Sequence, residues 1–163
     1  MSERVEEHEE TREELIEAFK RSRQRLIATL KGIPLRRMAE IVDGEWSIRE
    51  IVVHIIAWDE RSIADSRKIL NGEKTDTSHL EDVDEFNGKA ILEFASWSAR
   101  DLLTGLRLSS RNVLNFMRGL SDEDLKKANR GLIMPTVSWM MDYSNHDIEH
   151  ADQITAWREN NGL

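Results

Sequence analysis

The sequence contains no cysteine, and this absence excludes several kinds of site. Disulfide bonds, iron–sulfur clusters and zinc sites built from thiolates all require cysteine. A bound metal would therefore need ligands from histidine, carboxylate, backbone carbonyl or water.

Proline, glycine and aromatic residues are also scarce. The chain has two prolines and eight glycines in 163 residues, and its aromatic content is 6%. This composition favours long helices joined by few extended loops. We find no segment with a convincing period-two pattern of a β-strand. The length suits one domain with a full hydrophobic core, so we expect a single domain over residues 1–163, in which residues 1–10 fray.

Basic residues are outnumbered by acidic ones. The chain has 23 Lys and Arg against 31 Asp and Glu, a formal net charge of -8. Because affinity for nucleic acid depends on clustered basic residues, we expect no nucleic-acid partner, and an anionic membrane surface is disfavoured likewise. No apolar run is long enough to span a bilayer, and the acidic start MSERVEEHEE lacks the features of a secretion signal. The expected location is the cytoplasm.

Helix start signals divide the chain into four long amphipathic segments. At the start of the first three, a Ser or Thr is followed three residues later by an acidic residue, the pattern of a capping box. A polar stretch and one short helical segment, VDEFNGKAILEFA, separate the second from the third. The pattern predicts an all-α fold, a four-helix bundle with a crossover connection between helices two and three. The long helices are expected from Thr11 to about Gly32, from Ser47 to about Gly72, from Ser98 to Gly119 and from about Thr136 to Glu159.

Two of the five histidines lie four residues apart in the last predicted helix, in the stretch YSNHDIEHADQITAWREN. Residues at this spacing are only about 40° apart around a helix, so His146 and His150 can reach toward one point. Apolar and aromatic residues share the same stripe, which indicates that both imidazoles face inward. For an isolated pair, histidines satisfied by nearby carboxylates are the simpler interpretation.

A third histidine strengthens the case for a metal site. His54 lies inside the apolar run IVVHIIAW, where a neutral imidazole is costly unless it is hydrogen-bonded or coordinated. Taken alone, His54 is more simply interpreted as a core histidine with a hydrogen-bond partner. Metal sites in bundles are built from side chains on facing helices, and three imidazoles leave at least one position open for water or substrate. We therefore predict that His54, His146 and His150 bind one divalent ion, for which zinc, nickel and iron are all suitable.

Four other residues are candidates for supporting roles. Asp142 lies one turn before the histidine pair and is positioned to orient an imidazole, with Asp147 a weaker candidate. On the second helix, Trp58 would form an apolar wall of a substrate pocket, and Arg61 would bind a substrate carboxylate, if the pocket opens at that end. The simpler interpretation of Arg61 is a stem that covers the bundle and a head that reaches solvent.

Three segments of the chain, taken in order, resemble the DinB-like (DinB/YfiT-like) family of four-helix-bundle proteins. They are WSIREIVVHIIAWDE, VDEFN and HDIEHADQITAWR, and the resemblance covers nearly the whole chain. By this resemblance His54, His146 and His150 would be the family's metal triad. Understood members include transferases and isomerases that use low-molecular-weight thiols, and hydrolase-like detoxifying relatives. The resemblance thus implies an enzyme whose metal activates a thiol or water that attacks a small electrophilic molecule.

The alternative is a non-catalytic module, in which the ion or the imidazoles serve stability or the binding of a small ligand. Apolar positions such as Phe94, Trp97 and Met117 leave room for a homodimer interface, which would then carry the function. The sequence shows no clamp for a thiol carboxylate and no general base that would identify a substrate.

Overall fold

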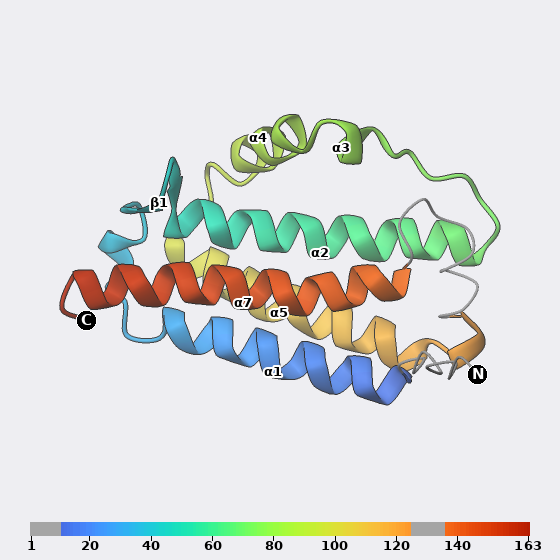
Figure 1. Cartoon of the computed structure of the whole chain (residues 1–163). Helices are drawn as coiled ribbons and strands as arrows, with labels where there is room; N and C mark the ends of the chain where they lie inside the picture. Colours follow the sequence, from blue (N-terminus) through green and yellow to red (C-terminus); the bar gives the residue numbers. More distant parts are fainter. Residues whose placement is uncertain (1–10, 125–135) are drawn as a thin grey trace, which may run out of the picture.

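Four long helices make up the body of the protein. The computed structural model describes residues 11–124 and 136–163, the second range without the side chains of 136–143. Figure 1 shows α1 and α7 running in one direction and α2 and α5 in the other. The predicted all-α four-helix bundle is confirmed, and no helix of the described part is long and apolar enough to cross a membrane. The long helices are α1 (Arg12–Leu30), α2 (Ile48–Leu70), α5 (Ala99–Gly119) and α7 (Thr136–Asn160).

Capping boxes begin three of these helices, as predicted. At the start of α2, the Glu50 carboxylate accepts a hydrogen bond from the backbone N–H of Ser47 at 2.7 Å, and the Ser47 hydroxyl accepts one from Glu50 N–H. Each box satisfies backbone groups that have no partner inside the helix. The same pairing occurs between Thr11 and Glu14 before α1, and between Ser98 and Asp101 before α5.

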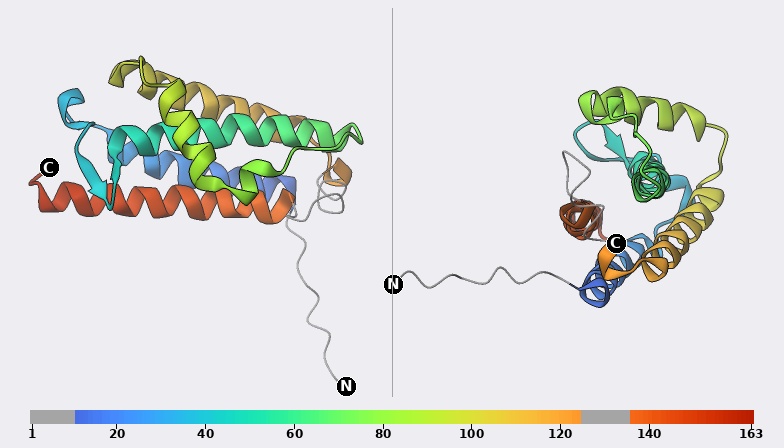
Figure 2. Two further views of the ribbon diagram at one scale, coloured as in Figure 1. Left: turned by 90° about the horizontal axis from the view of Figure 1, so that it is seen from above. Right: turned by 90° about the vertical axis from the view of Figure 1, so that its right-hand side faces the viewer.

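The connection from α2 to α5 crosses back along α2. It contains two short helices, α3 (Ser78–Glu81) and α4 (Val83–Glu93), and α4 packs on α2 with Asn87 and Ala90 buried. Because this connection returns the chain to the end of the bundle where α2 begins, α2 and α5 run parallel (Figures 1 and 2). The predicted crossover is thus confirmed, and it places α4 beside the first half of α2.

One short hairpin, for which the sequence showed no period-two pattern, accompanies the helices. After the short 3-10 helix η1 (Leu35–Arg37), β1 (Ile41–Asp43) and β2 (Trp46–Ser47) pair antiparallel, directly before α2. The two-residue loop is Gly44-Glu45, in which Gly44 takes a positive φ of 54°, and glycine at the first loop position is typical of a hairpin turn. Strands of three and two residues are too short to display a period-two pattern, so the sequence carries no such signal for this hairpin.

Two apolar clusters fill the interior, and they contain two of the residues proposed for a dimer surface. Phe94 belongs to the larger cluster and is 6% exposed, and Met117 belongs to the smaller one and is 2% exposed. Both side chains are therefore committed to the core, and the expectation that they face a partner is wrong. Trp97 is 39% exposed and lies over Gly105. The homodimer itself stays a prediction.

Candidate metal centre

The three histidines singled out in the sequence converge between α2 and α7. Nε2 of His54 lies 2.8 Å from Nε2 of His146, and Nε2 of His150 lies 3.0 Å from the same atom. One ligand atom from each ring lies within 4.8 Å of the other two. His54 and His150 are buried and His146 is half-buried. The fold thus brings three potential ligands from two helices to one point.

Amide side chains bind the outer nitrogens of two of these rings. Nδ1 of His54 lies 2.9 Å from Oδ1 of Asn87 on α4, and Nδ1 of His150 lies 2.8 Å from Oε1 of Gln153, one turn further along α7. An amide oxygen only accepts hydrogen bonds, so each Nδ1 carries the proton of its neutral ring. Each Nε2 therefore presents a lone pair toward His146.

This donor set fits a divalent cation. The Nε2 atom of His146 can donate one proton at most, so without a cation one of its two short nitrogen–nitrogen contacts would place lone pairs against each other. A cation at the centre is attracted to all three lone pairs. The three histidines could therefore hold a metal ion, and imidazole ligands suit zinc, nickel and iron alike.

Burial keeps the three imidazoles neutral. It lowers the pKa of His54 to about 4 and the pKa of His146 to about 3, and it also lowers the pKa of His150. Mutual repulsion of the rings lowers the pKa of His146 further, whereas the hydrogen bond to Asn87 opposes the change at His54. Neutral imidazole is the form that binds metals, so the rings are ready to bind at pH 7.

A pocket of about 320 Å³ opens beside the histidines. Trp46 of β2 meets the His54 ring edge-on at 4.8 Å and lies nearly parallel to the His150 ring at 6.4 Å, measured between ring centroids. Among the described residues, the lining includes two carboxylates and no Lys or Arg. Besides the three histidines and Asn87, the lining is formed by Asp43, Trp46, Ile51, Glu149 and Gln153.

The two aspartates proposed to orient an imidazole have different outcomes. The side chain of Asp142 lies outside the described residues, so its role stays a prediction. Asp147, the weaker candidate, accepts a hydrogen bond from Nε of Arg23 at 2.7 Å, and none of its described contacts involves a histidine of the triad. In the described part of the chain, the side chains that bind Nδ1 of His54 and Nδ1 of His150 are the amides of Asn87 and Gln153.

Trp58 and Arg61 are absent from the lining of the pocket in the described part of the chain. The Arg61 guanidinium donates to Asp65 at 2.9 Å and to the backbone carbonyl of Asp76 at 2.5 Å. The Trp58 indole lies beside the His54 ring and donates its N–H to Oδ1 of Asn87 at 3.0 Å. Neither residue therefore contacts this pocket in the way the sequence led us to expect.

A buried ionic cluster near the histidines was not predicted. Arg23 on α1 donates to both Asp59 oxygens at 2.7 and 2.9 Å, to Asp147 at 2.7 Å and to the Ser110 hydroxyl at 3.0 Å. The three charged residues are at most 3% exposed. Burial raises the pKa of Asp147 to about 6, although Arg23 acts in the opposite direction. The cluster connects α2 and α7, which together carry the triad, with α1 and α5.

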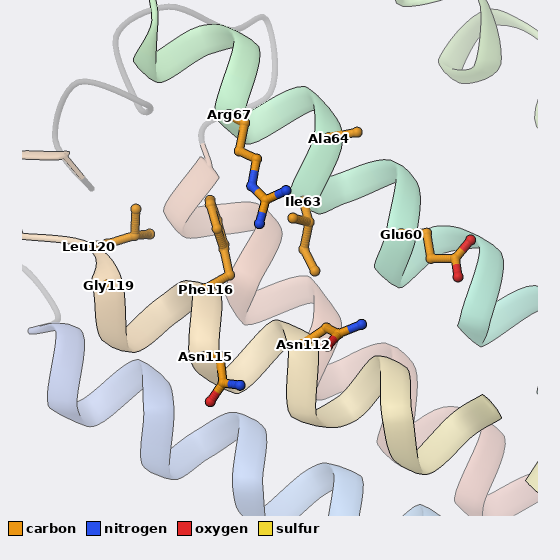
Figure 3. A pocket seen from close by; sticks show the side chains of 9 residues that line it. All are labelled: Glu60, Ile63, Ala64, Arg67, Asn112, Asn115, Phe116, Gly119 and Leu120. Atoms are coloured by element: carbon orange, nitrogen blue, oxygen red, sulfur yellow. The ribbon is translucent and has the colours of Figure 1, made fainter. Parts of the chain in front are cut away.

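A larger groove, of about 670 Å³, lies between α2 and α5 (Figure 3). Its described lining contains no histidine. Figure 3 shows its acidic residue, Glu60, and its basic residue, Arg67, far apart along the groove. Among the described residues, His54, His146 and His150 form the group of potential ligands that converge, so we place the candidate metal centre at the smaller pocket.

The fold and the site together define a four-helix-bundle protein with a three-histidine centre. The sequence model of the DinB superfamily matches residues 18–154, so the chain belongs to this family. A comparison with curated proteins found no match.

Several solved structures share the fold. The sibling lethal factor precursor DfsB matches with a TM-score of 0.82 and 17% identity, over 94% of this chain and 98% of that one. The colibactin self-resistance protein ClbS, solved in complex with a dsDNA, matches with a TM-score of 0.80 and 14% identity, over 91% and 95% of the two chains. YfiT from Bacillus subtilis, described as a probable metal-dependent hydrolase with an unusual four-helix bundle topology, matches with a TM-score of 0.69 and 14% identity, over 100% and 94%.

Proposed function

We propose that this protein is a metal-dependent enzyme of the hydrolase type that acts on a small electrophilic molecule. The observation that carries the proposal is the convergence of three neutral Nε2 atoms, from His54, His146 and His150, beside an open pocket. When bound there, a divalent ion would act as a Lewis acid and bring the pKa of a water ligand toward neutrality. The description of YfiT as a probable metal-dependent hydrolase supports the same class of activity.

The residues around the triad would orient the ligands and shape the pocket. Asn87 and Gln153 fix the planes of two imidazoles through hydrogen bonds to Nδ1. Trp46 packs against two of the rings and keeps water from that side, and Ile51 adds an apolar surface. A small uncharged group of the substrate would therefore lie against Trp46, with its reactive atom toward the histidines.

The charge of the pocket favours water over a carboxylate-bearing thiol as the attacking group. Asp43 and Glu149 place two carboxylates in the lining of the pocket, and like charge disfavours an anionic molecule that approaches it. Arg61, the residue considered for binding a substrate carboxylate, is already paired with Asp65. A neutral or cationic electrophile thus suits the described lining better than an anionic one.

Turnover of chosen electrophiles tests the proposal. The zinc-, nickel- or iron-loaded protein would be assayed against esters, amides and epoxides, with and without added thiol, beside a His54→Ala variant whose fold is verified by circular dichroism. We expect hydrolysis without thiol, and its loss in the variant.

Other outcomes of this assay would replace the proposal. Turnover that requires the thiol would make the protein a thiol transferase, which is the other enzyme class that the family resemblance implies. Equal turnover in His54→Ala would contradict the role of the triad. A metal-loaded protein that transforms none of these substrates would favour the non-catalytic module.

A further inference from the structure

We infer that Trp58 is a positioning residue, which selects the metal-binding tautomer of His54 through the side-chain amide of Asn87. The inference rests on the metal site proposed above. It assigns a role to an indole that lies beside the site without lining its pocket in the described part of the chain.

The orientation of the Asn87 amide follows from its hydrogen-bond partners. Oδ1 of Asn87 lies 3.0 Å from the indole Nε1 of Trp58 and 2.9 Å from Nδ1 of His54. An indole N–H can only donate, so the atom that faces it must be the amide oxygen. The same oxygen has a second lone pair for the imidazole. Asn87 is only 6% exposed, so bulk water has little access to compete for these contacts.

The opposite amide orientation would make the histidine unsuitable as a ligand. If the NH₂ group of Asn87 faced His54, Nδ1 would have to accept a hydrogen bond, and the single proton of the neutral ring would move to Nε2. Nε2 is the atom that points at His146 and at the proposed ion. A flipped amide would also set its NH₂ against the N–H of Trp58. The indole therefore disfavours the orientation that would block metal binding.

The crossover holds the indole in the required place. Trp58 packs against Phe86 of α4 with ring centroids 4.7 Å apart, and against His79 of α3 at 5.7 Å. Asn87 follows Phe86 directly in the chain. The same element that supplies the amide thus fixes the donor that orients it, which gives the long connection between α2 and α5 a function at the metal site.

A second and more exposed contact acts on His150 by the same logic. Nε2 of Gln153 donates to the Asp43 carboxylate at 3.0 Å, and a carboxylate only accepts, so Oε1 must face Nδ1 of His150. Because Asp43 is exposed, water can replace this contact at little cost. Loss of Asp43 should therefore matter less than loss of the indole N–H of Trp58.

The test uses a cycle of four proteins: the parent, Trp58→Phe, Asn87→Asp and the double variant. Phe keeps an aromatic ring but removes the N–H, and a carboxylate has no N–H that could face His54. In the metal-free proteins, ring nitrogen chemical shifts report which His54 nitrogen carries the proton. The affinity for added zinc is measured by competition with a chelator, and Asp43→Ala serves as the weaker comparison.

We expect Nδ1 to carry the proton in the parent, both tautomers to be populated in Trp58→Phe, and zinc affinity to fall about tenfold in that variant. In the Asn87→Asp background the Trp58→Phe change should alter neither the tautomer nor the affinity. If Asn87→Asp does not fold, Asn87→Leu replaces it, and removal of the amide should equally abolish the effect of Trp58→Phe.

Two results would overturn the inference. One is a parent tautomer and parent affinity in Trp58→Phe, and the other is an equal loss of affinity in both backgrounds. Failure of the metal site itself gives a different result, because the parent would then bind no zinc although its His54 tautomer still responds to Trp58→Phe.

Discussion

At the scale of single residues, Arg23 illustrates how a buried charge depends on its partners. Its guanidinium is 3% exposed and forms hydrogen bonds with Asp59 and Asp147, both of which are fully buried. Burying an unpaired carboxylate costs free energy. Removal of Arg23 would leave two such carboxylates in the interior, so it should destabilise the protein more than the ion pairs stabilise it. Each carboxylate would lose a strong donor from the same side chain.

Replacing Arg23 with Met should therefore destabilise the protein strongly. The variant leaves two buried carboxylates without their cation, and we expect a loss of about 3–5 kcal/mol in the free energy of unfolding. Urea denaturation at pH 7, followed by circular dichroism, measures it. Arg25→Met is the matched control, because Arg25 lies on the same helix and pairs with Asp152 at the surface, where about 0.2–1 kcal/mol is expected. Equal losses in the two variants would contradict this account.

The sequence predicted the histidines but not the residues that hold them. Spacing on a helix and an apolar environment were enough to select His54, His146 and His150. The contact of Asn87 depends on how the crossover folds back over α2, which no local pattern encodes. Arg23 did carry a signal, since it continues the apolar stripe of Phe19 and Leu26 on α1, where a charged residue needs buried partners.

At the scale of elements, two glycines inside helices allow the effect of helix propensity on stability to be distinguished from the effect of packing. Gly88 in α4 has nothing within 4 Å of the place where a Cβ would stand. At Gly105 in α5, the added atom would lie 3.0 Å from the Trp97 ring and 3.2 Å from Ile56. Substitution by alanine should therefore affect the stability of the protein differently in the two helices.

We expect Gly88→Ala to stabilise the protein by about 0.5–1 kcal/mol, because alanine restricts the unfolded chain and favours the helix. Gly105→Ala should gain nothing or lose stability, because the Trp97 ring and Ile56 must shift to admit the methyl group. Thermal unfolding of both variants beside the parent measures the difference. An increase in stability in Gly105→Ala would contradict this account, because it would show that the Trp97 ring and Ile56 admit the methyl group without cost.

Elements with local signals were predicted well. The capping boxes marked the beginnings of α1, α2 and α5, since the side chains that satisfy a helix end lie within three residues of it. The hairpin before α2 was missed because its strands are short and its stability depends on neighbours. That hairpin supplies Trp46 and Asp43 to the pocket, so these two lining residues were missed with it.

At the scale of the whole molecule, the net charge of -8 bears on the choice of partner. The neighbour ClbS was solved with a dsDNA, but at 14% identity it shares the fold alone. The formal charge of this chain opposes the counterion release that drives association with DNA. Absence of a nucleic-acid partner therefore stays our prediction.

Fluorescence anisotropy of a labelled DNA duplex measures this directly. We expect no binding at micromolar protein in physiological salt, and no gain in low salt, because the phosphates and the protein carry like charge. Saturable binding that weakens as salt is raised would contradict the prediction and would place a basic surface on the chain.

The central claim is that the three histidines hold a metal ion, and the metal content of the purified protein tests it most directly. Untagged protein, prepared without added metal or chelator, would be analysed by mass spectrometry beside a His54→Ala/His150→Ala double variant and a His79→Gln control, which changes a buried histidine outside the triad. We predict about one divalent ion per chain in the parent and the control, and its loss in the folded double variant. A metal-free parent that cannot be loaded with zinc, nickel or iron would contradict the claim.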